Sequence, residues 1–235
     1  MSDKIPLILL PGLLCDAALW AHQVDHLSDI ADVQVADLSG ADSMAALAKS
    51  VLDTAPPTFS VAGLSMGGYV ALEIIRQAPE RVCHLALLDT NASADLPEQS
   101  ERRLKLIKIA ESGGLGMVAQ QMLPALVHPD HVEEPDIVIT FLKMAEQVGV
   151  AGFVNQQKAI LNRVDSTQNL AAITCPTLVL CGAEDQLSSV DVHTKMAENI
   201  GDNALFVSIA NCGHLSSIEQ PNAVSTVLRA WLLGD

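Results

Sequence analysis

The sequence has few aromatic residues and few positive charges. Phe, Trp and Tyr make up 3% of its 235 residues, and its 13 Lys and Arg are outnumbered by 28 Asp and Glu, which gives a formal net charge of −15. An electrostatic field of this sign repels nucleic acids and anionic membrane surfaces, so we expect neither as a partner. The scarcity of aromatic rings also argues against a sugar or nucleotide site with aromatic walls.

Long uninterrupted apolar runs are absent too. The longest candidate near the start, residues 5–14, is broken by Pro11 and Gly12. It has neither a basic segment before it nor a small-residue cleavage site after it. It therefore predicts a buried strand, and we expect neither a signal peptide nor a membrane span.

The cysteines form no metal or redox motif. None of the five, Cys15, Cys83, Cys175, Cys181 and Cys212, belongs to a C-x-x-C pair, which disfavours a dithiol redox site and a zinc knuckle. Their odd number, with three of them in or beside apolar runs, favours reduced thiols, and reduced thiols favour a cytoplasmic protein. No glycine-rich phosphate loop is present either, so no cofactor is predicted.

Short apolar segments alternate with longer amphipathic segments along most of the chain, of which 49% is hydrophobic. Strands are predicted at residues 5–10, 33–37, 59–63, 84–89, 177–181 and 204–210. Helices are predicted at residues 17–27, 44–53, 66–77, 190–200 and 222–233. Apolar strands with little alternation are typical of a parallel sheet that is buried on both faces. The pattern therefore predicts an α/β fold with a doubly wound, mostly parallel sheet.

One part of the chain departs from this rhythm. Residues 91–172 contain no convincing strand, and helices are predicted there at 101–111, 115–126, 136–148 and 152–163. We interpret residues 1–90 and 173–235 as the core domain and residues 91–172 as an inserted helical lid over the carboxyl edge of the sheet. The lid's apolar residues, such as Met117, Met122, Phe141, Met144 and Phe153, are expected mostly to pack, with some lining a substrate pocket.

The strongest motif is Gly63-Leu64-Ser65-Met66-Gly67-Gly68, a G-x-S-x-G sequence between a predicted strand and a predicted helix. A serine exposed on so tight a turn leaves no room for a Cβ two residues before or after it, which explains Gly63 and Gly67. The helix that begins at Met66 directs free N–H groups toward the serine. The same letters also occur in plain glycine-rich turns, but the flanking strand and helix favour Ser65 as a nucleophile.

A serine needs a base to remove its proton, and the base needs an acid to orient it. Of seven histidines, His214 follows the last predicted strand, at the same sheet edge as Ser65. Asp185 follows the preceding predicted strand and is the preferred acid. Glu184, its neighbour, and Asp89, which ends an earlier strand, remain alternatives. The order Ser, Asp, His along the chain is the one that this architecture requires.

An oxyanion intermediate needs two N–H donors. The residue after the nucleophile, Met66, supplies one, and the loop after the first strand, Pro11-Gly12-Leu13-Leu14, supplies the other, with Leu13 as the better candidate. Alternatively, Leu13 and Leu14 only line the pocket.

Together, Leu10–Leu13, Gly63–Gly68, Gly182–Asp185 and Gly213-His214 resemble the α/β-hydrolase superfamily over nearly the whole chain. Within it, the chain is similar to small bacterial esterases and 3-oxoadipate enol-lactonases. The resemblance implies about six strands, with the usual N-terminal antiparallel strands missing, and a Ser65–His214–Asp185 triad. One departure is Pro11-Gly12, where the family usually has His-Gly, which changes what braces the oxyanion loop.

A serine nucleophile favours acyl chemistry, and we expect hydrolysis of a small-molecule carboxylic ester through an acyl-enzyme on Ser65. The alternatives are an enol-lactone hydrolase, a C–C or thioester hydrolase, and a protein of this fold that only binds its ligand. An anionic enol-lactone requires a cation near the lid. Arg102, Arg103 and Lys105 are available there, although a solvated helix face is the simpler interpretation of these charges. The oligomeric state stays open, with a homodimer as one alternative.

A metal site would support a different mechanism from the serine nucleophile. The candidate ligands are His128, Asp130, His131, Glu133 and Glu134, but they lack the helical H-E-x-x-H spacing, and Pro129 lies between the histidines. We therefore interpret them as a polar lid loop and predict no metal.

Overall fold

The computed structural model describes residues 4–234. Its centre is a six-stranded sheet in the order β2-β1-β3-β4-β5-β6, in which every neighbouring pair is parallel. The strands are β1 (Ile5–Leu10), β2 (Ala31–Val35), β3 (Phe59–Leu64), β4 (Val82–Leu88), β5 (Thr177–Gly182) and β6 (Ala204–Ile209). All residues of β3 and β5 are buried, as expected of a parallel sheet covered on both faces. The predicted α/β fold is confirmed, and the described residues add no antiparallel strand.

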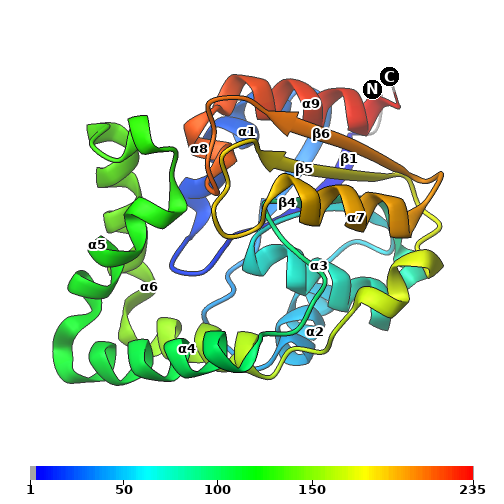
Figure 1. Cartoon of the computed structure of the whole chain (residues 1–235). Coiled ribbons are helices and arrows are strands. Elements are labelled where there is room, and N and C mark those ends of the chain that lie inside the picture. The colour runs from blue at the N-terminus through cyan, green and yellow to red at the C-terminus, as the bar shows by residue number, and fades with distance from the viewer. Residues whose placement is uncertain (1–3, 235) are drawn as a thin grey trace.

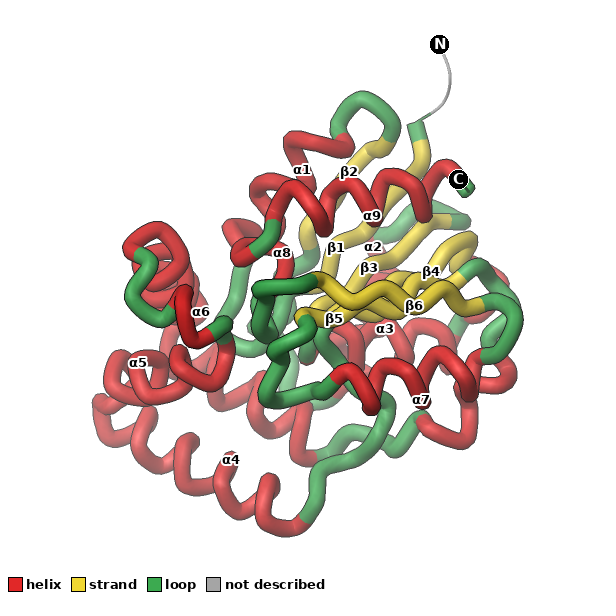
Figure 2. Tube along the Cα trace, turned by 45° about the horizontal axis from the view of Figure 1, so that its top comes forward, coloured by secondary structure: helices red, strands yellow, loops and turns green. Residues whose placement is uncertain are grey.

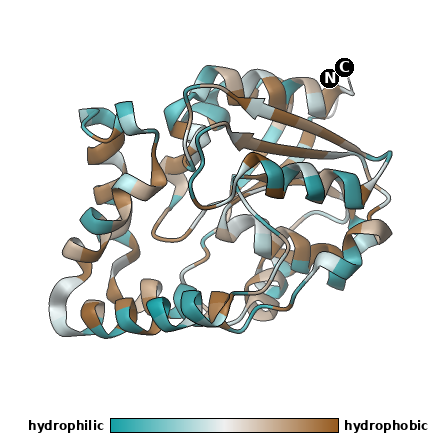
Figure 3. Ribbon diagram, in the orientation of Figure 1, coloured by the Kyte–Doolittle hydropathy of each residue, from teal (hydrophilic) through white to brown (hydrophobic). Residues whose placement is uncertain are grey.

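Helices cover both faces of this sheet. One face carries the 3₁₀ helix η1 (Ala17–Trp20), α1 (Ala21–Leu27), the short α8 (Ser216–Glu219) and α9 (Pro221–Leu233). The other carries α2 (Met44–Thr54), α3 (Met66–Gln77) and α7 (Val190–Ile200). Figure 2 shows α1 and α9 on one side of the strands and α3 and α7 on the other. Figure 3 shows hydrophobic strands enclosed between them.

The strand period of two divides the core into two layers. In β1, Leu7 and Leu9 belong to the layer under α1 and α9, whereas Ile8 and Leu10 belong to the layer under α2 and α3. The strand order also reverses at β1, which has β2 on one side and β3 on the other. Ligands of such sheets bind beyond the carboxyl ends of the strands where the order reverses, which points to the ends of β1 and β3.

Between β4 and β5 the chain is helical. The elements are α4 (Pro97–Ile109), the π-helical turn η3 (Ala110–Gly114), α5 (Leu115–Leu126), η4 (Pro129–His131), α6 (Pro135–Leu161) and η5 (Thr167–Ala172). In Figure 1, α4, α5 and α6 lie beyond the end of the sheet to which the strands point. The buried Phe141, Met144 and Phe153 pack in the core layer that includes α5, whereas Met117 is exposed. The division at residues 91 and 172 stays a prediction.

Some element bounds differ from the prediction. The two helices expected at 136–148 and 152–163 are one element, α6, interrupted at Gly149 (φ 66°, ψ 178°). The helix expected from residue 101 begins at Pro97, because proline suits the first turn and the Gln99 side chain accepts the N–H of Leu96. The second strand begins at Ala31, where it pairs with Ile5.

Helix α6 is the only helix of the described residues that is long and apolar enough, by length and composition, to cross a membrane. We did not expect such a helix from the sequence, because the sequence has no long unbroken apolar run. Its Phe141, Met144 and Phe153 are buried in the core layer that includes α5. The core helices of globular proteins pass the same test of length and composition.

Candidate active site

Ser65 lies on the sharp turn between β3 and α3. Its backbone has φ 55° and ψ −115°, a conformation that costs a non-glycine residue about 1–3 kcal/mol and persists only where the surroundings enforce it. The Ser65 N–H donates to the Leu88 carbonyl (2.9 Å), and the Ser65 carbonyl accepts the Thr90 hydroxyl (2.8 Å). The end of β4 therefore holds the backbone of the turn and leaves the Ser65 hydroxyl free.

Glycines make this turn possible, as predicted. A Cβ on Gly63 would meet the Gly67 carbonyl, and a Cβ on Gly67 would meet the Leu10 carbonyl. Both obstacles are backbone atoms, which cannot move aside as the end of a side chain can. A Cβ on Gly68 would meet the Thr90 side chain, so Gly68 also has a packing role.

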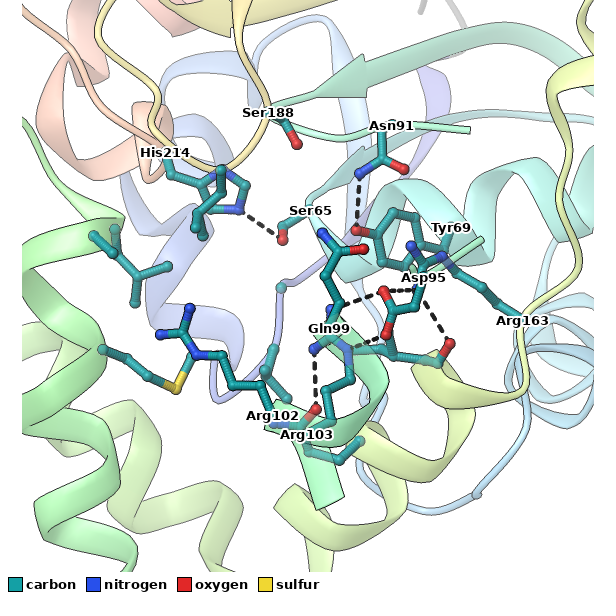
Figure 4. Close-up of a pocket in the computed structure, with 18 of the residues that line it drawn as sticks. Ser65, Tyr69, Asn91, Asp95, Gln99, Arg102, Arg103, Arg163, Ser188 and His214 are labelled. Carbon is teal, nitrogen blue, oxygen red and sulfur yellow. Dashed lines mark hydrogen bonds and ion pairs between the residues drawn. The ribbon is translucent and has the colours of Figure 1, made fainter. Parts of the chain in front are cut away.

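The structure brings Ser65, His214 and Asp185 together in one array, with His214 between the other two. The His214 Nε2 atom lies 2.8 Å from the Ser65 hydroxyl, and the His214 Nδ1 atom lies 2.8 Å from the Asp185 carboxylate. Each residue comes from a loop at the carboxyl end of a different strand, namely β3, β5 and β6. Asp185 and His214 are 5% and 3% exposed, so water does not compete for their contact. Figure 4 shows the His214 ring directed at Ser65.

The electrostatics of the array suit a base oriented by an acid. Burial disfavours the Asp185 carboxylate, but His214 and the N–H groups of Leu187 and Ser188 outweigh burial and hold the pKa of Asp185 below its usual value. Burial likewise disfavours the His214 imidazolium, but the charge and hydrogen bond of Asp185 raise the pKa of His214 above its usual value. Asp185 is therefore ionised when His214 accepts a proton.

The two alternative acids, Asp89 and Glu184, bind backbone N–H groups and form no hydrogen bond with His214. Asp89 directly follows β4 and is fully buried, and its carboxylate accepts the N–H groups of Gly182 (2.9 Å) and Ser216 (3.2 Å). Burial, followed by the charge of Asp185, raises the pKa of Asp89 well above its usual range. Glu184 accepts the N–H of Cys212 (3.0 Å). Both carboxylates brace the loops of the array, whereas Asp185 contacts the imidazole.

The predicted oxyanion loop lies beside the serine. An added Cβ on Gly12 would lie 3.5 Å from the Ser65 Cβ, and Leu13 lines the same cavity as Ser65. Met66 opens α3, so its N–H has no carbonyl in the preceding turn of the helix to bind. Leu14, at φ 60°, is buried, and its N–H donates to the Gln156 side chain of α6 (3.0 Å). Gln156 thus braces a loop in which Pro11 replaces the usual histidine.

A cavity of about 440 Å³ opens over this array. The core contributes Leu13, Ser65 and His214 to its wall, and the lid contributes apolar side chains that include Leu106, Met122, Leu126 and Ile160. A cavity of this volume suits a small organic molecule.

The polar wall of the cavity comes from the first and last parts of the lid. Arg103 and Arg163 both bind Asp95 (2.6 and 2.7 Å), and Arg163 also stacks on the Tyr69 ring. Burial alone would raise the pKa of Asp95, but hydrogen bonds from the two arginines outweigh burial, so the pKa of Asp95 lies below its usual value. Arg102 also lines the cavity and forms no ion pair with a carboxylate of residues 4–234, and Figure 4 shows it apart from that cluster. Lys105 is exposed and does not line the cavity.

The residues weighed as metal ligands do not gather. Within residues 4–234, no group of three or more His, Cys, Asp or Glu side chains is arranged to hold a metal ion. His131 instead binds the buried Glu219 of α8 (2.8 Å), and the Glu133 and Glu134 side chains are exposed.

Comparison with known proteins agrees with the fold. A sequence profile of the alpha/beta hydrolase family matches residues 7–227. The chain belongs to the alpha/beta hydrolase family. It is similar in structure to a thermophilic esterase from Thermogutta terrifontis, solved with malate bound, at a TM-score of 0.89 and 31% identity over 99% of this chain and 90% of that one.

Two curated bacterial relatives are similar in sequence. A 3-oxoadipate enol-lactonase from Acinetobacter baylyi is 24% identical, over 97% of this chain and 89% of its own length. A pimeloyl-[acyl-carrier protein] methyl ester esterase from Nitrosomonas europaea is 25% identical, over 92% of this chain and 90% of its own length. This hydrolase is thus related along its whole fold to enzymes that cleave esters and lactones.

We expect Asp185→Asn to lower kcat for an ester by about 10³- to 10⁴-fold, because the imidazole loses its orienting carboxylate. The acid limb of the kcat/KM profile should also move to lower pH. Activity needs neutral His214, and the Asp185 charge that raises the pKa of His214 is gone. The exposed Asp191→Asn is the control. An Asp185→Asn enzyme with wild-type kcat would show that another acid orients His214.

Proposed function

We propose that this hydrolase cleaves carboxylic esters of small molecules through an acyl-enzyme on Ser65. The observation that carries the proposal is the array in which His214 lies 2.8 Å from both the Ser65 hydroxyl and the Asp185 carboxylate. A serine in such an array is activated, because the base takes its proton as the hydroxyl attacks.

In the first half of the reaction, the Ser65 oxygen bonds to the ester carbonyl carbon while its proton moves to His214 Nε2. The N–H groups of Leu13 and Met66 stabilise the oxyanion that forms. The bond to the alcohol oxygen then breaks, and the alcohol leaves with the proton from His214.

In the second half, a water molecule attacks the acyl carbon and gives its proton to His214. The bond to Ser65 breaks, the free acid leaves, and Ser65 recovers its proton. Asp185 stabilises the imidazolium in both halves and stays ionised.

The relatives support ester chemistry over the alternatives of C–C or thioester cleavage and of ligand binding without turnover. Two of them are named esterases and one an enol-lactonase. We also propose a cytoplasmic location, supported by the five cysteines, which form no disulfide among residues 4–234.

The test is hydrolysis of a panel of short acyl esters and lactones by the wild-type protein and by Ser65→Ala. We expect turnover by the wild type and a loss of at least about 10⁴-fold in kcat for the variant. Mass spectrometry of the wild type, quenched during turnover, should find the acyl group on Ser65. Equal rates for the two proteins would contradict the proposal.

A narrower candidate is an ester or enol-lactone that itself carries a carboxylate. Arg102 faces the cavity without a carboxylate partner in residues 4–234, although the chain as a whole is acidic. Gln157 also lines the cavity. Its amide oxygen accepts Arg103 (3.0 Å), and its buried amide nitrogen has no partner among the described residues. A buried N–H donor without an acceptor lowers the stability of the protein, and a substrate carboxylate or carbonyl would supply that acceptor.

The names of two relatives fit this candidate. The oxoadipate lactone is the lactone of a dicarboxylic acid, and the esterase structure holds malate, a dicarboxylate. In this interpretation Arg103 and Arg163 neutralise Asp95, and Arg102 and Gln157 bind the substrate anion.

Arg102→Gln tests the candidate with two methyl esters of a four-carbon acyl chain, the anionic monomethyl succinate and the neutral methyl butyrate. We expect KM for the anionic ester to rise by about 10- to 100-fold and KM for the neutral ester to stay unchanged, because a charge-assisted hydrogen bond is lost only for the first. Lys105→Gln, on the same helix but outside the cavity, should change neither. An equal change for both esters would rule out a carboxylate subsite at Arg102.

A further inference from the structure

Glu219 is a buried carboxylate that the reaction scheme does not use. It ends the short helix α8, and its side chain has no exposed surface. A charged group in such a place is tolerated only where hydrogen bonds replace the lost water. Glu219 has four: one oxygen accepts the N–H groups of Gly213 and Leu215 (both 3.1 Å), and the other accepts the His128 N–H (2.7 Å) and the His131 ring (2.8 Å).

The two oxygens face different parts of the molecule. Gly213 and Leu215 are the residues on either side of His214, whereas His128 and His131 belong to the lid segment after α5. The Glu219 carboxylate therefore joins the loop of the proposed base to the lid.

A second contact ties the same two segments together. The N–H groups of His214 and Leu215 both donate to the Leu126 carbonyl at the end of α5 (3.0 and 3.1 Å). A Cβ on Gly213 would lie 2.5 Å from the His128 nitrogen, so the loop and the lid segment touch backbone to backbone. The N–H groups of residues 213, 214 and 215 therefore donate to Glu219 or to the Leu126 carbonyl of α5, and none of them donates to a strand of the sheet.

We propose that Glu219 is a positioning residue of the reaction, which holds the backbone on both sides of His214 to the lid segment 126–131 and so sets where the imidazole stands. This proposal rests on the proposed function, since it assumes that His214 is the base for Ser65. The lid then supports the array directly, in addition to covering the cavity.

The charge of Glu219 supplies a readout that a purely structural role would not move. The acidic groups that face His214 are Asp185, Asp89 and Glu219, and after Asp185 and Asp89 the Glu219 charge contributes to the raised pKa of His214. Removal of the Glu219 charge should therefore lower the pKa of His214.

The test is Glu219→Gln, which keeps the size of the side chain and removes its charge. We expect kcat for a neutral ester to fall by about 10- to 100-fold with little change in KM, because a small displacement of the base slows the chemical step more than it weakens binding. NMR titration of the histidine rings should show the His214 pKa lower than in the wild type. The exposed Glu146→Gln of α6 is the matched control.

A folded Glu219→Gln protein with wild-type kcat and an unchanged His214 pKa would overturn the proposal. So would a loss of kcat that follows only a loss of melting temperature, with the His214 pKa unmoved. If Glu219→Gln does not fold, His131→Ala carries the test, because it removes only the lid-side hydrogen bond of the ring. A fall in kcat of about 3- to 10-fold at unchanged KM supports the proposal, and wild-type kcat overturns it.

The two proposals fail in different ways. If the wild-type protein shows no Ser65-dependent turnover, the proposed function fails. The histidine titration still reports whether Glu219 raises the pKa of His214, because that measurement needs no substrate.

Discussion

The left-handed backbone of Ser65 is the constraint on which the rest of the site depends. The turn projects the hydroxyl above the sheet edge only because Gly63 and Gly67 leave room for the crossing backbone. Its cost, about 1–3 kcal/mol, is offset by two hydrogen bonds, one that the Ser65 N–H donates to Leu88 at the end of β4 and one that the Ser65 carbonyl accepts from Thr90. Once Ser65 is fixed there, the partners it needs must come from the loops after β5 and β6.

Two carboxylates, the buried Asp89 and the exposed Glu184, hold those loops in place. Asp89 binds the N–H groups of Gly182 and Ser216, and Glu184 binds that of Cys212, so the loops of Asp185 and His214 are fastened to each other and to β4. The lid completes the frame. Gln156 holds the oxyanion loop, and the Leu126 carbonyl accepts hydrogen bonds from the loop of His214. The lid therefore holds the loops of the reacting groups in place and also forms part of the cavity wall.

Much of this architecture could be predicted from the sequence, because buried parallel strands are apolar throughout and their carboxyl ends meet at one edge. The order of strands and helices along the core follows from this, and so does the meeting of Ser65, Asp185 and His214. The choice of Asp185 over Asp89 could not be settled, since both follow strands. Only the direction of each carboxylate in the structure separates them.

The supporting residues could not be predicted. Gln156 and Glu219 are polar residues at buried positions, and nothing in the local pattern of either helix distinguishes them from surface residues. Their partners, Leu14 and His128, lie far away in the sequence, so only the folded chain shows the contacts. The role of Asp95, which binds two arginines while Arg102 has no carboxylate partner among residues 4–234, is hidden for the same reason. By contrast, Pro97 was a readable signal for the earlier start of α4, because proline is favoured at the first position of a helix.

Labelling with a fluorophosphonate probe is the direct test of whether Ser65 is an activated nucleophile. We expect a single adduct, located on Ser65 by mass spectrometry, that forms in the wild type and not in Ser65→Ala. A folded wild-type protein that takes no label, or takes it on another residue, would show that Ser65 is not activated.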